Sequence, residues 1–214
     1  MRLVSALYEE FHPFYQLANV EDYAVVNKPS DLKKGDILIT HGGADISPQF
    51  YKKGRSSRGG GDIAGSRRDW LEWDLQVKAK VMGIPIIGIC RGAQMLCALE
   101  GGHLIQHIDG HSGMHEVFLN DAVASVMTNS IHHQQMVPAG EYELVGWTLP
   151  KSKGYWDVDS DGKDHVLPQP PLLKDPEFVY YPAIKGFAVQ WHPEMMSEEA
   201  PANQFLINFI NSKL

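Results

Sequence analysis

The segment from Ile84 to Gly102 reads IPIIGICRGAQMLCALEGG, and it predicts a buried strand, a sharp turn and a helix in that order. The apolar run Ile86 to Ile89 is typical of a strand that is buried on both faces in a parallel sheet. Good helix formers follow from Ala93 to Leu99, and two glycines end the helix. Cys90 therefore lies at the turn between the strand and the helix.

Cys90 stands in the pentapeptide Gly88-Ile89-Cys90-Arg91-Gly92, which fits the small-x-nucleophile-x-small pattern of a nucleophile elbow. The glycines relieve crowding at a strained turn and leave the nucleophile above the sheet. The N-terminus of the following helix favours a thiolate, and its free N–H groups, starting with that of Arg91, can stabilise an oxyanion. The alternative is a buried core cysteine, which the strand-turn-helix context disfavours.

The last strong strand ends in Gln190-Trp191-His192-Pro193-Glu194. Side chains two residues apart in an extended segment point to the same face, so we expect His192 and Glu194 to be neighbours, with Pro193 favouring the extended form. This predicts a triad in which His192 takes the thiol proton and later protonates the leaving amine, while Glu194 orients the imidazole. An isolated His-Pro-Glu tripeptide is otherwise typical of a surface turn.

Three blocks of the sequence resemble the signature blocks of class I glutamine amidotransferases: GICRGAQ at 88–94, TNSIHHQ at 128–134 and AVQWHPE at 188–194. Within that superfamily, GGADISPQFY from Gly42, followed by RRD at 67–69, is most similar to the γ-glutamyl-γ-aminobutyrate hydrolase branch of the peptidase C26 type. The blocks stand in the family's order, and four together are far more specific than any one of them.

The resemblance implies a flavodoxin-like fold and a role for several further residues. Gly43 matches the loop residue whose N–H joins that of Arg91 in the oxyanion hole, and Gln94 matches a glutamine-contacting position. Ser130, Ile131 and His132 match the segment that holds the α-amino and α-carboxylate groups of a glutamyl substrate. The alternative for Ser130 and His132 is a polar loop whose hydrogen bonds serve structure alone.

The implied activity is cysteine-dependent hydrolysis of a γ-glutamyl amide, glutamine or a γ-glutamyl amine, through a γ-glutamyl thioester and without a cofactor. One alternative is a glutaminase subunit that supplies ammonia to a separate synthetase, and another is a non-catalytic binding relative. The leaving amine, the ammonia acceptor, the pathway and the oligomeric state, with a homodimer among the options, are left open.

The chain of 214 residues has the length of one compact domain, and we expect a single three-layer α/β domain with a mostly parallel sheet. Strands are predicted at 2–7, 23–27, 37–39, 86–89, 116–119, 142–147, 178–181 and 186–191, and helices between the first two strands, at 68–81, at 93–99 and at 202–210. Residues 52–65 are predicted to form a loop that covers the site, and about 150–176 an insertion.

The composition excludes several classes of protein. A net charge of −7 without a basic cluster argues against nucleic acid as a ligand, and no apolar run approaches the 18 residues of a membrane helix. The N-terminus lacks the pattern of a signal peptide. Because the two cysteines, Cys90 and Cys97, are placed too far apart on one helix face for a disulfide, a reducing cytoplasm is expected, with Cys97 in the core.

Two arrangements resemble metal sites, but the sequence predicts no metal at either. Histidines recur at 103, 107, 111 and 115, yet glycines interrupt any helix that would align them, so structural or incidental roles are expected. Asp157 to Gly162 begins like a calcium-binding loop, but Pro168 stands at the twelfth position, where a bidentate Glu is needed. An Asp-rich turn is predicted there.

Overall fold

The computed structural model describes residues 1–120, 124–150, 154–158 and 162–214. The helices in this part of the chain are α1 (Arg67–Met82), α2 (Arg91–Leu99) and α3 (Pro201–Lys213). The strands are β1 (Arg2–Ala6), β2 (Asp22–Val26), β3 (Asp36–Thr40), β4 (Ile86–Ile89), β5 (His103–Ile105), β6 (His107–Ile108), β7 (Gly113–Leu119), β8 (Ser125–Ser130), β9 (Gln135–Val137), β10 (Glu143–Thr148), β11 (Tyr155–Val158), β12 (Asp164–Val166), β13 (Asp175–Tyr181) and β14 (Gly186–Val189).

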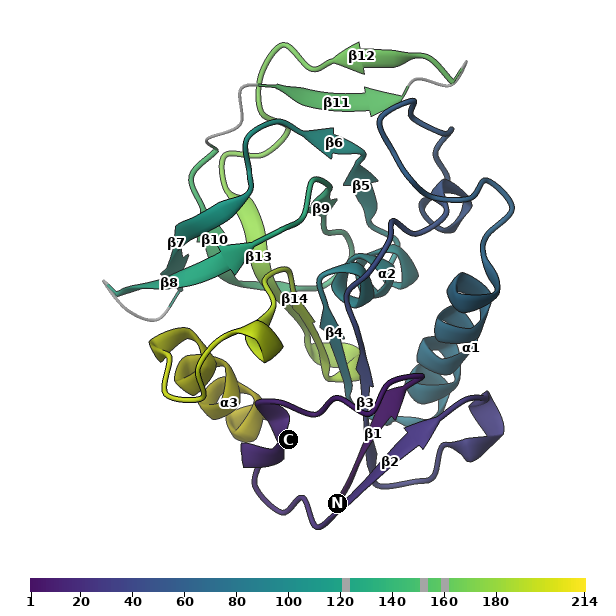
Figure 1. The fold of residues 1–214 in the computed structure, drawn as a ribbon, viewed down its shortest axis with the longest axis vertical. Helices are drawn as coiled ribbons and strands as arrows, with labels where there is room; N and C mark the ends of the chain where they lie inside the picture. The colour runs from purple at the N-terminus through teal and green to yellow at the C-terminus, as the bar shows by residue number, and fades with distance from the viewer. Residues whose placement is uncertain (121–123, 151–153, 159–161) are drawn as a thin grey trace.

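The main sheet has, within the described residues, nine strands in the order β2-β1-β3-β4-β14-β13-β10-β7-β8. The five strands from β2 to β14 run parallel, and the remaining strands continue the sheet in antiparallel register. Helices α1 and α2 pack on one face, and α3 packs on the other (Figure 1). The predicted three-layer α/β fold is confirmed, and its parallel part contains the elbow.

The residues next to the two helices on the first face determine where these helices begin and end. The Ser66 side chain accepts a hydrogen bond from the Asp69 N–H while Asp69 accepts from Ser66, which forms a capping box at the start of α1. Gly83 ends α1 in the left-handed conformation. Cys90 alone separates the end of β4 from the start of α2. The carboxyl end of this central strand therefore leads directly into the N-terminus of a helix.

The expected strands are found, but one expected helix is not. The segment between β1 and β2 contains a 3₁₀ turn at Phe14–Gln16 instead of an α-helix, although the two strands pair in parallel as predicted. Six further strands in the described part of the chain were not predicted from the sequence: β5, β6, β8, β9, β11 and β12. These strands are short or polar, as in SVMTNS of β8, so their side chains carry little of the apolar alternation that identifies a strand.

The described part of the 150–176 insertion forms a small sheet. Strands β11 and β12 make an antiparallel hairpin, and β11 also pairs with β6 (top of Figure 1). The 52–65 loop packs against this sheet: the Arg58 guanidinium lies 3.7 Å from the Trp156 ring centre, and the Ser56 N–H donates to Gln106 Oε1 at 3.1 Å. The middle of the predicted Asp-rich turn, residues 159–161, lies outside the described residues. None of the described helices is long and apolar enough to cross a membrane.

Candidate active site

Cys90 occupies the turn between β4 and α2 in a conformation that is rare for a residue with a side chain, with φ +47° and ψ −103°. The Cys90 N–H donates to the Val189 carbonyl at 2.7 Å, and the Cys90 carbonyl accepts the first helical hydrogen bond from the Gln94 N–H at 3.0 Å. The strand-turn-helix prediction is confirmed for this segment. The strained backbone holds a nearly buried thiol, 6% exposed, at the helix N-terminus.

The two glycines of the elbow are needed because neighbouring backbone leaves no room for a side chain. A Cβ on Gly92 would lie 2.3 Å from the Thr40 carbonyl oxygen, and a Cβ on Gly88 would lie 2.5 Å from the Gly92 carbonyl oxygen. These contacts pack the first turn of α2 directly against β3 and β4. The predicted reason for glycine at both positions, relief of crowding, agrees with these distances.

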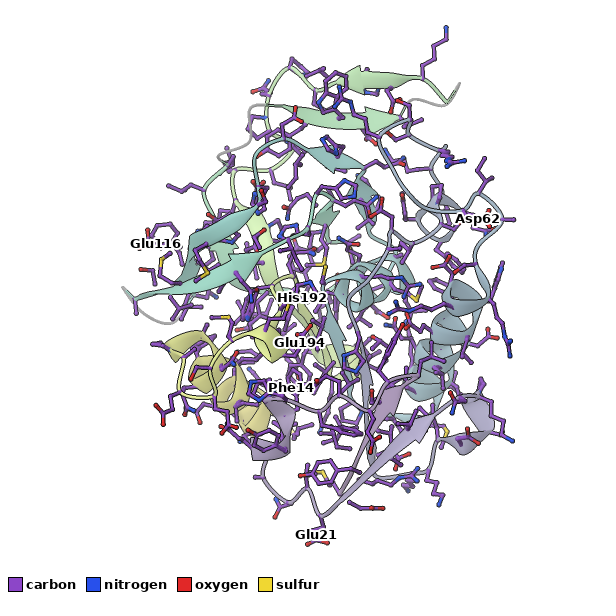
Figure 2. The ribbon with its side chains drawn as sticks, viewed as in Figure 1. Phe14, Glu21, Asp62, Glu116, His192 and Glu194 are labelled. Atoms are coloured by element: carbon purple, nitrogen blue, oxygen red, sulfur yellow. The ribbon has the colours of Figure 1, made fainter. Side chains whose placement is uncertain are left out.

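His192 and Glu194 lie side by side near the centre of the molecule (Figure 2). His192 Nδ1 is 2.6 Å from Glu194 Oε1. The expectation that an extended segment brings them together is wrong: β14 ends at Val189, and Pro193–Met195 form a 3₁₀ turn that carries the carboxylate back to the imidazole. The turn starts at proline, whose fixed φ suits the first residue of a helical turn.

The surroundings of His192 favour its charged form. Burial lowers the pKa of His192, but hydrogen bonds with the Cys90 thiol and with Glu194 outweigh burial and raise it to about 10. At neutral pH the imidazole is therefore protonated between a sulfur and a carboxylate.

Asn129 holds the backbone of His192 and was missed in the sequence analysis. Its Oδ1 accepts from the His192 N–H at 2.8 Å, and its Nδ2 donates to the His192 carbonyl at 2.9 Å. The residue belongs to the TNSIHHQ block, so the block itself was the signal that could have identified it. Asn129 connects β8, at the end of the main sheet, to the histidine that faces Cys90.

A cavity of about 540 Å³ opens beside His192 and Glu194. It is lined by Gly43, which the resemblance assigns to the oxyanion hole, and by Ile131, which it assigns to substrate binding and which is 61% exposed. Gly43 has φ +147°, a conformation that favours glycine. The remaining lining comes from Tyr8, Glu10, His41, Gly42, Arg68 and Met195. The 52–65 loop, which was expected to cover the site, does not line this cavity.

The other predicted substrate residues lie apart from Ile131. Gln94 is buried in the first turn of α2. The Ser130 hydroxyl donates to the His111 carbonyl, and His132 Nδ1 lies 3.0 Å from the Gln134 carbonyl oxygen. Both side chains are buried, so they contact protein groups instead of the cavity. Within the 130–132 segment, the Ile131 side chain is the one that lines the cavity.

A buried ion-pair network supports the site from the side of α1. The Arg91 guanidinium pairs with Asp69 and Glu72, and Arg68 Nε donates to Glu72 at 2.8 Å. Arg68 also donates to the Gly42 carbonyl at 2.8 Å. Burial lowers the pKa of Arg91 to about 10, which leaves it charged at neutral pH. The network therefore fixes the loop after β3 relative to the first residue of α2.

Comparison with known proteins identifies relatives of the chain. The family model of peptidase C26 matches residues 28–145, a region that includes Cys90 and Asn129. A Mycobacterium tuberculosis protein named as a glutamine amidotransferase is 33% identical over 170 residues, covering 73% of this chain and 50% of the relative. The γ-glutamyl-CDP-amidate hydrolase of Campylobacter jejuni is 32% identical over 114 residues, covering 53% of this chain and 50% of the relative. The chain thus spans half the length of these two relatives.

Two further comparisons extend this result. The γ-glutamyl-γ-aminobutyrate hydrolase of Escherichia coli O157:H7 is 25% identical over 184 residues, covering 81% of this chain and 69% of the relative. A crystal structure of a Thermoplasma acidophilum protein described as a GMP synthase subunit has a TM-score of 0.63 at 14% identity. It covers 100% of this chain and 94% of that chain, so the two share a fold.

Proposed function

The chain belongs to the peptidase C26 family, and on that premise we propose that it hydrolyses γ-glutamyl amides through a thioester at Cys90. The observation that carries the proposal is the arrangement of Cys90, His192 and Glu194. A thiol stands at a helix N-terminus opposite an imidazole, and that imidazole is 2.6 Å from a carboxylate. This is the nucleophile, base and orienting group that acyl transfer from an amide requires.

The proposed reaction has two halves. The proton of the Cys90 thiol passes to His192 and the sulfur attacks the γ-carbonyl carbon, while the N–H groups of Gly43 and Arg91 stabilise the oxyanion of the tetrahedral intermediate. The C–N bond then breaks, and the imidazolium of His192 gives its proton to the departing amine. Water next attacks the thioester with His192 as base, which releases glutamate and returns the thiol.

The substrate class rests on the cavity and on the relatives. Two of the related proteins are named as hydrolases of γ-glutamyl compounds. In this chain we assign the γ-glutamyl group to the space between Ile131 and His192, where Ile131 is the residue of the 130–132 segment that lines the cavity. The leaving group is then ammonia, if the substrate is glutamine, or a small amine.

A second candidate is a glutaminase subunit that supplies ammonia to a separate synthetase. The observation in its favour is the similarity to the Mycobacterium tuberculosis protein named as a glutamine amidotransferase. The chemistry at Cys90 is the same in both candidates, so they differ in the acceptor of the nitrogen. A subunit of this kind has low activity alone and gains activity with its partner.

The test is glutamate release from glutamine and from a panel of γ-glutamyl amines, with ammonia measured in parallel. Cys90→Ala is the blank, and Cys97→Ala is the matched control because Cys97 is buried in the core at the other end of α2. We expect turnover in the wild type and Cys97→Ala, and none in Cys90→Ala with the fold intact. Preference for a γ-glutamyl amine favours the hydrolase, and turnover of glutamine alone favours the amidotransferase subunit. Activity in Cys90→Ala would exclude both.

A further inference from the structure

Three histidines converge on one buried carboxylate away from the Cys90 elbow. His111 precedes β7, His115 lies on β7, His132 lies between β8 and β9, and Glu177 lies on β13. The Nε2 atoms of His111, His115 and His132 lie 2.9, 3.5 and 3.6 Å, respectively, from Glu177 Oε1. One potential ligand atom from each of His111, His132 and Glu177 lies within 4.8 Å of the other two.

Hydrogen bonding fixes the orientation of His132. Its Nδ1 lies 3.0 Å from the Gln134 carbonyl oxygen, and a carbonyl accepts hydrogen bonds only, so Nδ1 carries the proton. In a neutral imidazole the lone pair is then on Nε2, which points at the Glu177 carboxylate from 3.6 Å. A lone pair that faces a carboxylate in a buried site repels it unless a cation lies between them.

Polar atoms at the cluster also lack partners. Among the described residues, the buried Nε2 atoms of His115 and His132 and the Oε2 atom of Glu177 have no hydrogen-bond partner. Leaving such atoms unpaired in a buried site destabilises the folded protein. Three unsatisfied atoms around one point are more simply explained by a shared ligand than by three separate defects.

The geometry points to a metal ion: we propose that His111, His132 and Glu177 bind one divalent transition metal, with Zn²⁺ as the first candidate and His115 at the edge of the site. Imidazole and carboxylate ligands bind Zn²⁺ at about 2.0–2.2 Å in a tetrahedron, which separates ligand atoms by roughly 3.3 Å. The separations of 2.9 and 3.6 Å from Glu177 Oε1 to the Nε2 atoms of His111 and His132 lie on either side of this value. The carbonyl that holds His132 Nδ1 is the outer-shell partner that metal-binding histidines usually have.

The surroundings supply a route for the ion and a role for the site. A cavity of about 140 Å³ is lined by His111 and His115 together with the exposed Ser112 and Met114. Three protein ligands leave one position of a tetrahedron for water or for His115, which lies at the edge of the site. The metal would hold β7, β13 and the 130–134 segment together, and that segment carries Ile131 to the cavity beside His192.

The site can be tested by metal binding to protein that carries no histidine tag, independently of any activity. The protein is stripped with a chelator and titrated with Co²⁺, whose visible spectrum reports a tetrahedral site, and then with Zn²⁺ in competition. Glu177→Gln and His132→Ala test the cluster, and His115→Gln, at its edge, keeps the buried His111–Glu177 pair. His165→Ala, on the exposed face of β12, is the matched control, and Cys90→Ala excludes binding at the elbow.

We expect one equivalent of tight metal in the wild type, His165→Ala and Cys90→Ala. Affinity falls at least 100-fold in Glu177→Gln and His132→Ala, and at least 10-fold in His115→Gln. Zn²⁺ raises the melting temperature of the wild type but not of Glu177→Gln. The proposal is overturned if the stripped wild type binds no metal at micromolar Co²⁺ or Zn²⁺, or if folded cluster variants, as judged by circular dichroism, bind as the wild type does.

Discussion

Asn129 binds both backbone polar groups of His192, accepting from its N–H at 2.8 Å and donating to its carbonyl at 2.9 Å. The histidine that faces Cys90 therefore depends on a side chain from β8, the last strand of the main sheet. Two hydrogen bonds from one amide group fix both the position and the rotation of the peptide. The strand at the end of the sheet thus contributes to the position of His192, although it carries no proposed reacting group.

Asn129→Ala tests this positioning role. We expect kcat to fall by about 10- to 100-fold with little change in KM, because a displacement of about 1 Å at a reacting group has effects of this size. Loss of two partly buried hydrogen bonds also lowers the free energy of unfolding by about 1–3 kcal/mol. Steady-state kinetics and urea denaturation measure the two effects. The control is the exposed Asn120→Ala, and equal kinetics in the two variants would contradict the role.

Gly92→Ala tests the packing of the elbow. The new Cβ would lie 2.3 Å from the Thr40 carbonyl oxygen, so α2 must move away from β3 and take Cys90 with it. We expect a loss of at least about 1–3 kcal/mol in the free energy of unfolding, together with loss of activity. The matched control is Gly59→Ala, where the nearest atom is 3.7 Å away. Thermal denaturation compares the two, and equal stability would show that the elbow tolerates a side chain.

The elbow could be predicted from sequence because its determinants are local. Within Ile84 to Gly102, apolar residues indicate the strand, flanking glycines indicate the turn and helix formers indicate the helix. The prediction for His192 and Glu194 named the right neighbours for a wrong reason, since a 3₁₀ turn and not an extended segment joins them. Spacing by two residues fits both geometries, so it could not distinguish between them.

Contacts across the sheet could not be predicted in the same way. The spacing of His111 and His115 would align the two side chains only on a helix, and the glycines in this segment exclude a helix. In the fold, a loop and a strand bring these two histidines to His132 and to Glu177 from β13. Sequence periodicity identifies the residues that share one face of a single helix or strand. The residues of this cluster come from four separate segments of the chain, so no periodicity relates them.

Glu72→Gln tests the buried ion-pair network. Glu72 is fully buried and pairs with both Arg68 and Arg91, so its neutralisation leaves buried guanidinium groups short of negative charge. We expect the free energy of unfolding to fall by about 3–5 kcal/mol. The control, Glu100→Gln, removes the more exposed pair with Lys80 and costs about 0–1 kcal/mol. Guanidinium denaturation of both variants checks this, and similar losses would contradict a special role for the network.

Glu194→Gln tests the charge state of His192. The pKa of His192, about 10, lies above the ordinary value of 6.5, so the imidazolium is present at neutral pH and is lost as pH rises through about 10. If the imidazolium protonates the leaving amine, kcat/KM falls along an alkaline limb at that pH. An amide in place of the carboxylate removes one of the two hydrogen-bond partners that raise this pKa, so the limb moves to lower pH.

The substitution also reduces kcat by about 10²- to 10⁴-fold, because the imidazole loses the group that sets its tautomer and stabilises its charge. The measurement is the pH dependence of γ-glutamyl amide hydrolysis, with Glu199→Gln, an exposed residue five positions along the chain, as the control. An alkaline limb that stays in place while kcat falls would mean that the limb reports a group other than His192. A limb that moves together with the fall in kcat identifies His192 as the acid that protonates the leaving amine.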